Sequence, residues 1–491
     1  MIEFENGQGS ARDTNLQAVI DIGSNTVRLV IFGGDPRVPT VVLNEKVQAR
    51  LGKGLATGGK LSGKSMATAL KALRRFALIL QARAIAQVHT VATAAVRDAS
   101  NGGEFLAQVE ELGLKPRLLS GEEEALTSAL GIAGAFPGAR GVVADLGGGS
   151  LELVHIAGWT REHGSSLPLG TLRLPGLRSA APQKFRRETE QMIAATGSRC
   201  QPGEALYLVG GSFRALARYY LHSTNSPLDD PHGSEIEADK AHALCRRLQR
   251  TAPTGPVPGI STARMNALQD TAALLEPLIA ATRAERLVFS GWGLREGVVL
   301  QSLPESDWHC DPFSRAAMAF TRMQGVSKTL ATETAKWIAP AVTFPAGGEE
   351  RKIAAIALGL ALRNFDPNLR TATALKWALR KRWIGLDSEG RAMLAACLLA
   401  SVNRPIPDEV RRLAKPDEIH GAIAVGMAVR LCWRLTGFAP ALLPQSALHI
   451  RNDQLVLTLK GEARNLSSDG AAKDLNQLAR YLGLRPVLED S

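Results

Sequence analysis

Residues 19–31 read VIDIGSNTVRLVI, and residues 143–156 read VADLGGGSLELVHI. Aligned on Asp21 and Asp145, both segments contain an apolar run, the Asp, an apolar residue, a Gly, two small residues, a hydroxyl residue and a second apolar run. A β-rich run that breaks at small residues and then resumes is typical of a strand–turn–strand hairpin. The sequence therefore predicts two copies of one hairpin, one in each of two related parts of the chain.

The turns of both hairpins have the composition of an anion-binding loop. Glycines let backbone amides approach an anion closely, and a hydroxyl adds a donor. Thr26 falls opposite Ser150, and Arg28 falls opposite Glu152. We therefore expect two half-sites that clamp a phosphate between them. The candidate residues are Asp21, Gly23, Ser24, Asn25, Thr26 and Arg28 in the first copy, and Asp145, Gly147, Gly148, Gly149, Ser150 and Glu152 in the second.

Outside the hairpins, strand-like and helix-like patterns alternate up to about residue 305. Such alternation in two related halves predicts an α/β architecture with two sheet domains and a cleft between them. Beyond it the chain becomes rich in Ala and Leu at helical spacing, and a hairpin pattern follows around Asn452-Asp453. The expected division is a flexible tail (1–14), a first sheet domain (15–137), a second sheet domain (138–305), a helical domain (306–440) and a small α+β domain (441–491).

The charge of the chain is unevenly distributed. The formal net charge is +11, and residues 311–491 contain 25 Lys and Arg against 17 Asp and Glu. Such an excess favours a polyanionic partner through electrostatic steering and counterion release. A merely basic soluble surface explains the same count, and charge by itself favours that simpler explanation.

Composition also excludes several classes of protein. No stretch approaches the roughly 20 apolar residues of a membrane span, and the polar start MIEFENGQGSARDTN does not resemble a secretory signal. We therefore expect a cytoplasmic protein without a membrane partner. The five cysteines lie far apart and their number is odd, so we expect buried thiols rather than disulfides or a metal site.

Two interpretations of Glu123 remain open from the residues themselves. The segment Ser120-Gly121-Glu122-Glu123 forms a capping box, in which Glu123 bonds back to the Ser120 amide. Glu123 also shares a helix face with Leu126 and Leu130, which favours an inward position and a role in deprotonating a water. Cap and base are equally compatible with this pattern.

Three further features are candidates for phosphate binding. Gly210, Gly211 and Ser212 follow an apolar strand and precede a helix, whose N-terminus is a general anion site. Arg97 closes the strand-like segment VATAAVR, and Arg28 alternates with apolar neighbours on one side of a strand. Either guanidinium can pair with phosphate oxygens. A solvated sheet face explains each arginine equally well.

Five motifs follow one another along the chain in a characteristic order and spacing: DIGSNTVRLVIF, ATAAVRDASN, LLSGEEEALTSALG, DLGGGSLELV and GWGLREGVV. In this the chain resembles the exopolyphosphatase/guanosine pentaphosphate phosphatase (Ppx/GppA) family, which belongs with sugar kinases, actin and Hsp70-type ATPases. The resemblance covers about residues 15–305 and implies two ribonuclease-H-like domains that face each other across the active site.

The resemblance also implies roles for individual residues. The family's water-activating glutamate corresponds to Glu123, which favours the base over the cap. Asp145 and Glu152 are similar to the metal-associated carboxylates. The phosphate cradle would comprise Gly147, Gly148, Gly149 and Ser150, with Asp21, Gly23, Ser24, Asn25 and Arg97 on the opposite wall. Longer family members carry a helical region similar to HD phosphohydrolases, but this chain has no histidine between His309 and His420, so we expect no HD-type metal centre.

The function implied by the resemblance is hydrolysis of the terminal phosphoanhydride of inorganic polyphosphate. Mg²⁺ is the expected cofactor, K⁺ is a second candidate ion, and a homodimer without a specific nucleic-acid partner is expected. The alternatives are hydrolysis of guanosine pentaphosphate and phosphotransfer from polyphosphate to ADP. An ATP-dependent kinase of the same superfamily is the alternative from another class.

Overall fold

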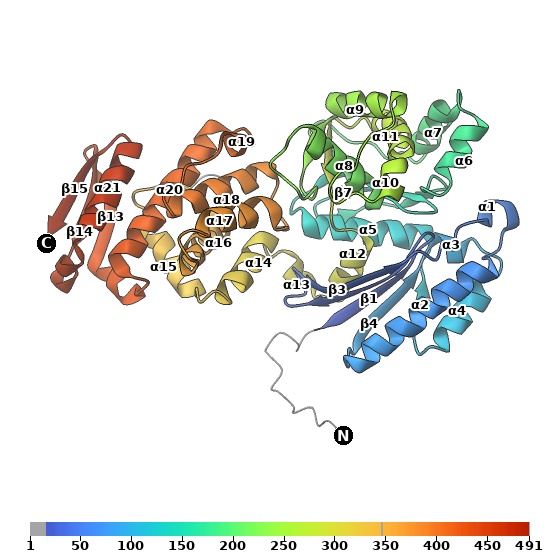
Figure 1. Cartoon of the computed structure of the whole chain (residues 1–491), viewed down its shortest axis with the longest axis horizontal. Coiled ribbons are helices and arrows are strands. Elements are labelled where there is room, and N and C mark those ends of the chain that lie inside the picture. Colours follow the sequence, from blue (N-terminus) through green and yellow to red (C-terminus); the bar gives the residue numbers. More distant parts are fainter. Residues whose placement is uncertain (1–15, 345–346, 491) are drawn as a thin grey trace, which may run out of the picture. The chain divides into compact units, whose positions relative to one another are not determined.

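The computed structural model describes residues 16–344 and 347–490, and the chain forms two units (Figure 1). The first unit runs to Thr224 and resumes from Pro231 to Cys310, and the second comprises Asn225–Asp230 and the chain from Asp311 onward. Within the described residues, no helix is long and apolar enough to cross a membrane.

The first unit contains a five-stranded sheet with the strand order β3-β2-β1-β4-β5. β1 pairs with β2 and β2 with β3 in antiparallel fashion, whereas β1–β4 and β4–β5 are parallel. The predicted first hairpin is thereby confirmed. The strands are β1 (Gln17–Ile22), β2 (Val27–Gly33), β3 (Thr40–Val47), β4 (Gln87–Ala92) and β5 (Pro116–Leu118).

A second sheet in the same unit repeats this plan. β6 pairs with β7 and β7 with β9 in antiparallel fashion, whereas β6–β10 and β10–β12 are parallel. The duplication predicted from the two hairpins is therefore confirmed. The strands are β6 (Arg140–Leu146), β7 (Leu151–Ala157), β9 (Ser165–Leu167), β10 (Ala205–Val209) and β12 (Arg286–Phe289), with β8 (Thr160–Arg161) and β11 (Glu235–Glu237) at the edges.

Amphipathic helices cover one face of each sheet. On the first sheet, Leu73 and Phe76 of α2 and Phe105 of α4 enter the core with the apolar residues of β1 and β2. On the second sheet, α7, α8, α9 and α11 contribute to a larger core. The helices of this unit are α1 (Leu55–Gly58), α2 (Gly63–Ala82), α3 (Ala94–Arg97), α4 (Gly102–Glu110), α5 (Gly121–Ala135), α6 (Leu174–Ala180), α7 (Phe185–Ala194), α8 (Gly211–Ser223), α9 (Ala238–Arg250), α10 (Thr262–Asn266), α11 (Leu268–Thr282), α12 (Leu294–Gln301) and α13 (Glu305–Trp308).

Two helices exchange places between the sheets. Ala129 and Ile132 of α5 pack against Val143 of the second sheet, although α5 follows the last strand of the first. Conversely, Val298 of α12 packs against Val19 of β1. The expected boundary between the two sheet domains, at residues 137 and 138, stays a prediction. Each of the two helices packs on the sheet that lies on the other side of this boundary. Periodicity identifies the apolar face of a helix, whereas it does not identify the sheet that this face covers.

The exchange brings α5 and α12 into close contact. A Cβ atom on Gly297 would collide with the carbonyl oxygen of Thr127, and one on Gly131 would collide with that of Gly293. The backbones therefore approach more closely than any side chain permits at these positions. Glycine is needed here for space rather than for an unusual backbone conformation.

In the described residues of the second unit, helices run up to Thr436, and two antiparallel strands, a helix and a third strand follow. The expected bounds of a helical domain and a small α+β domain stay predictions. Asn452 and Asp453 form the turn between β13 and β14 with φ angles of 48° and 57°. The described elements are α14 (Pro312–Arg322), α15 (Lys328–Ile338), α16 (Gly348–Ala361), α17 (Arg370–Leu375), α18 (Ser388–Ser401), α19 (Asp408–Arg411), α20 (Pro416–Thr436), β13 (Ser446–Arg451), β14 (Gln454–Leu459), α21 (Asp469–Tyr481) and β15 (Arg485–Asp490), with a π-helical turn at Lys376–Arg380. The likeness of this unit to HD phosphohydrolases stays a prediction.

We predict that G297A destabilises the protein because the added methyl group must displace backbone at the α5–α12 contact. Overpacking of this kind costs about 1–3 kcal/mol of unfolding free energy. The matched control is G103A. Chemical denaturation of G297A, G103A and wild type measures the unfolding free energy of each. Gly103 is an exposed helical glycine with open space around its Cβ position, so alanine there is expected to stabilise by about 0.5–1 kcal/mol. Equal stability of the two variants would contradict the close approach.

Candidate active site

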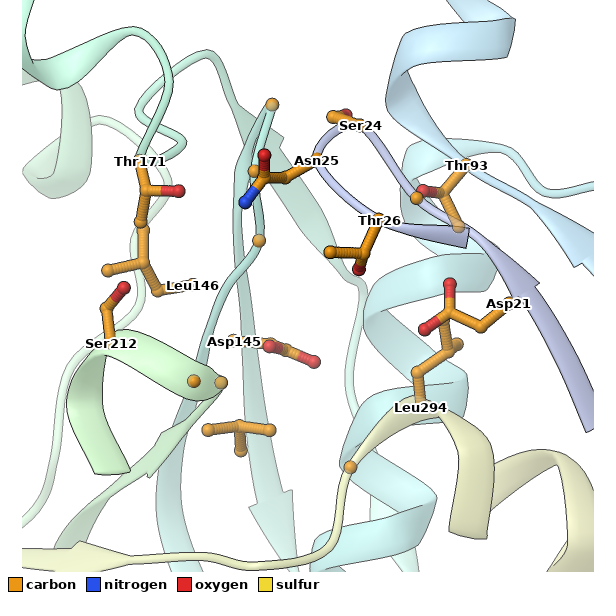
Figure 2. Close-up of a pocket in the computed structure, with 18 of the residues that line it drawn as sticks. Asp21, Ser24, Asn25, Thr26, Thr93, Asp145, Leu146, Thr171, Ser212 and Leu294 are labelled. Carbon is orange, nitrogen blue, oxygen red and sulfur yellow. The ribbon is translucent and has the colours of Figure 1, made fainter. Parts of the chain in front are cut away.

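A cleft of about 360 Å³ lies in the first unit and is lined by both hairpin turns. Other parts of its wall come from α5, the start of α8, α10 and the segment between β12 and α12. Figure 2 shows Asp21 and Asp145 on opposite walls, with their carboxylates directed toward each other. The two predicted half-sites therefore share one cavity.

Both hairpin turns have the same internal geometry. The amide of Gly23 donates to the carbonyl oxygen of Thr26 at 3.0 Å, and the amide of Gly147 donates to that of Ser150 at 3.0 Å. The equivalence that the sequence alignment predicts thus extends to the hydrogen bonding of the loops.

The two turns are in contact. A Cβ atom on Gly149 would lie 2.7 Å from Ser24 Oγ, and one on Gly148 would lie 3.1 Å from the amide nitrogen of Asn25. Figure 2 shows Ser24 and Asn25 in the turn opposite the second loop. Glycines in the second turn therefore permit the approach that closes the cleft at this end.

The start of α8 forms another part of the wall. Gly210 has a φ of 106°, and a Cβ atom there would collide with the carbonyl oxygen of Leu146. Gly211 and Ser212 then open the helix beside the cavity. Of the candidates for phosphate binding, those that line the cleft are Asp21, Gly23, Ser24, Asn25, Thr26, Arg28, Gly147, Gly148, Gly149, Ser150, Gly210, Gly211 and Ser212.

Four carboxylates line the cleft: Asp21, Glu124, Asp145 and Glu152. The hydroxyl of Ser128 donates to Asp145, and Ser166 Oγ donates to Glu152 Oε1 at 2.9 Å. Burial raises the pKa of both acids, and the neighbouring carboxylates raise that of Glu152 further. Ionising these buried carboxylates therefore costs free energy, and a bound cation or a proton offsets that cost.

The structure contradicts the expected position of Glu123. Its carboxylate accepts a hydrogen bond from the Ser120 amide at 2.8 Å, and its own amide donates to Ser120 Oγ at 3.1 Å. Glu123 is exposed and lies outside the cleft lining. It is the helix cap, one of the two roles that the sequence left open.

Glu124, the next residue, lines the cleft instead. Adjacent helix positions point in directions about 100° apart, so the capping geometry of Glu123 directs Glu124 into the cavity. Burial raises the pKa of Glu124 to about 7, even though Arg97 opposes that rise by hydrogen bonding and by its charge. Counting from the cap in the motif SGEEEA would have indicated Glu124 as the inward residue.

Arg97 also differs from its expected role. It ends the short helix α3 rather than a strand, and it does not line the cleft. Its Nη1 atom donates to Glu124 Oε2 at 3.1 Å and to the carbonyl oxygen of Leu119 at 2.9 Å. Arg97 therefore positions Glu124.

Several basic residues of the cleft were not among the candidates: Lys46, Arg214, Arg264 and Arg295. Arg295 lies 3.4 Å from the Asp21 carboxylate, measured from Nη1 to Oδ2. Its position in GWGLREGVV and the position of Arg214 two residues after Ser212 were signals in the sequence. Lys46 and Arg264 belong to segments without any recognisable motif.

The residues of the cleft fit a hydrated Mg²⁺ ion. Within the described residues, no group of three or more His, Cys, Asp or Glu side chains forms a metal cage. Mg²⁺ prefers oxygen ligands, retains several waters and needs only one or two carboxylates. Asp145 and Glu152, paired across β6 and β7 and both buried, supply such a set.

Two α/β lobes of one sheet plan, with glycine turns that face each other across an acidic cleft, define the class of fold. The amino-acid sequence identifies a particular family within this class. Residues 30–306 match the model of the Ppx/GppA phosphatase family, and the chain belongs to this family.

Individual relatives agree with this assignment. The chain is 28% identical over 337 residues to exopolyphosphatase 1 of Mycobacterium leprae, covering 64% of this chain and 97% of that protein. It is also 28% identical over 306 residues to exopolyphosphatase 1 of Mycobacterium tuberculosis, covering 58% and 87%. The crystal structure of the Aquifex aeolicus family member has a TM-score of 0.50 at 23% identity, covering 58% and 96%. An exopolyphosphatase from Cytophaga hutchinsonii has a TM-score of 0.50 at 22% identity, covering 58% and 97%. These two structures share the fold of the part of the chain that they cover.

We predict that E152Q stabilises the metal-free protein at alkaline pH. The pKa of Glu152 is raised on folding, so its ionised form is costly in the folded state and destabilises it as pH rises above the unfolded value of about 4.3. Thermal melts in EDTA should show a higher Tm for E152Q than for wild type at pH 8, with the difference vanishing near pH 4. A Tm that is lower for E152Q at every pH would contradict this account.

Proposed function

We propose that this chain is an exopolyphosphatase that hydrolyses the terminal phosphoanhydride of inorganic polyphosphate. The observation that carries the proposal is the convergence of two phosphate loops and four carboxylates on one cleft. The named exopolyphosphatases among its relatives supply the substrate class. The proposed location is the cytoplasm, as expected from the sequence, and the proposed assembly is a homodimer, on the basis of family resemblance.

In this proposal the terminal phosphoryl group binds between the two hairpin turns. Their backbone amides and the hydroxyls of Thr26 and Ser150 would donate to its oxygens as charge develops in the transition state. The contact between Gly149 and Ser24 fixes the spacing of the two loops. Arg295, beside Asp21, would add positive charge to the same wall.

Glu124 is the proposed general base. It lies in the cleft, and a pKa of about 7 suits a group that must accept a proton near neutral pH. Arg97 would hold the carboxylate toward the attacking water through its 3.1 Å hydrogen bond. The role that resemblance gave to Glu123 thus passes to its neighbour.

Asp145 and Glu152 would hold Mg²⁺. When bound, the ion neutralises negative charge on phosphate oxygens and orients the scissile group. Ser128 and Ser166 orient these two carboxylates through the hydrogen bonds described above. K⁺ as a further ion stays a proposal from resemblance.

Guanosine pentaphosphate ends in the same anhydride, but the lining of the cleft favours an inorganic chain. Among the described lining residues, Trp292 is the aromatic side chain, and it is 5% exposed. A guanine base bound in the cleft would therefore lack an exposed aromatic platform for stacking.

We predict that E124Q lowers the rate of phosphate release from polyphosphate by about 10²–10⁴-fold, the usual contribution of a general base. The variant should still bind polyphosphate because the loops are unchanged. Phosphate release from wild type and variant, with polyphosphate and guanosine pentaphosphate and with and without Mg²⁺, measures this effect and tests the proposed activity.

E123Q is the matched control for that variant. It makes the same chemical change one residue earlier, at the exposed cap, so near-wild-type turnover is expected. A large loss in E123Q with normal turnover in E124Q would restore the original assignment of the base. Faster release from guanosine pentaphosphate than from polyphosphate would reverse the proposed substrate.

We further predict that R97Q moves the acid limb of the pH–rate profile to higher pH. Arg97 lowers the pKa of Glu124 by its hydrogen bond and its charge, so removing it leaves the carboxyl protonated up to a higher pH. Profiles of kcat/KM against pH for R97Q and wild type measure the shift. A lower rate with an unchanged limb would mean that Arg97 does not act through Glu124.

A further inference from the structure

Each lobe contributes a row of three side chains that runs across its first strands. In the first sheet, Asp21 of β1 is paired with Arg28 of β2, and Arg28 is paired with Lys46 of β3. Residues directly opposite on neighbouring strands share a face of the sheet. Because neighbouring strands lie about 4.8 Å apart, the row extends about 10 Å from Asp21 to Lys46.

The equivalent row in the second sheet has a different chemistry. Asp145 of β6 is paired with Glu152 of β7, and Glu152 is paired with Ser166 of β9. The first row is therefore acid, arginine, lysine, whereas the second is acid, acid, hydroxyl. Arg28 and Lys46 in the first sheet therefore occupy the positions that Glu152 and Ser166 occupy in the second. Two cations stand where the other copy has the acid and the hydroxyl of the candidate magnesium site.

The basic row leads from the reaction centre to solvent. Asp21, Arg28 and Lys46 all line the same cleft. Asp21 has a side chain that is 20% exposed, Arg28 is half-buried and Lys46 is exposed. The row therefore connects the acidic end of the cleft with its mouth.

In the described part of the chain, the cations Lys46 and Arg264 form no ion pair. Arg28 Nε donates to Asn44 Oδ1 at 2.8 Å, and in the described part of the chain the side chains of Lys46 and Arg264 make no hydrogen bond or ion pair. Burial lowers the pKa of Lys46, and Arg264, Arg28 and Arg214 lower it further. Cations that border an open cavity without an ion-pair partner, as Lys46 and Arg264 do, are typical of a polyanion site.

The other face of β3 shows that this lack of partners is specific to the cleft. Glu45 precedes Lys46 and points to the opposite face, where Arg75 forms a bidentate pair with it. On the face of β3 toward α2, the charge of Glu45 is therefore neutralised by Arg75. On the face toward the cavity, the charge of Lys46 is not neutralised by an ion pair in the described residues.

We propose that Arg28 and Lys46 form a phosphate subsite that guides a polyphosphate chain from the reaction centre to the cleft mouth, with Lys46 as a specificity-determining residue for chain length. This inference rests on the proposed exopolyphosphatase function. Tripolyphosphate has two phosphates beyond the one that is cleaved, whereas a long chain continues past them. Lys46, at the outer end of the row, therefore contacts the long chain only.

The test is the substitution K46Q, measured with tripolyphosphate and with long-chain polyphosphate. An exposed charge contact is worth up to about 1 kcal/mol, which corresponds to about a two- to fivefold change. KM for long-chain polyphosphate should rise by this factor, while KM for tripolyphosphate and kcat for both should stay at wild-type values. Equal rises for both substrates, or no rise, would overturn the proposal.

K71Q is the control for the loss of one positive charge. Lys71 is exposed on α2 of the same unit and does not line the cleft, so its substitution should change neither KM. Binding of long-chain polyphosphate without Mg²⁺ gives a readout that is independent of hydrolysis. Weaker binding by K46Q than by K71Q supports the subsite, and equal binding overturns it. If the wild type hydrolyses neither substrate, the proposed function is rejected, but weaker binding by K46Q still supports the subsite.

Discussion

The direct contact of the two hairpin turns is the constraint on which the site depends. Gly148 and Gly149 meet Ser24 and Asn25 without room for a side chain. Because of this contact, Asp21 and Asp145 face each other across a single cavity. A Cβ atom at either glycine would require Ser24 or Asn25 to shift, and the spacing of the two loops would change.

Charge is arranged around this contact in two opposed groups. The second lobe supplies the paired acids Asp145 and Glu152, and the first supplies Arg28 and Lys46 at the corresponding positions. In the proposed reaction both kinds of group would act on the phosphoanhydride, because a metal held by the acids and a set of fixed cations would each neutralise part of its charge. Divergence of one duplicated hairpin thus provides two complementary halves of a site.

The sequence predicted the hairpins, their pairing and the glycine turns that line the cleft, because glycine turns between β-rich runs are local signals. It placed Glu123 in the cleft, whereas the structure places the next residue, Glu124, there, because Glu123 caps the helix. Arg97 has a clear motif, but its partner Glu124 depends on how α3 and α5 pack. Lys46 and Arg264 reach the cleft through tertiary structure that no local pattern encodes.

The exchange of α5 and α12 has a consequence for the order in which the protein can fold during synthesis. β1 begins at Gln17, yet the helix that covers one of its faces spans Leu294–Gln301. An emerging chain must therefore carry an uncovered apolar sheet face until nearly three hundred residues have left the ribosome. Such long-range closure is slow and exposes aggregation-prone surface, so the first lobe is expected to depend on chaperones until α12 arrives.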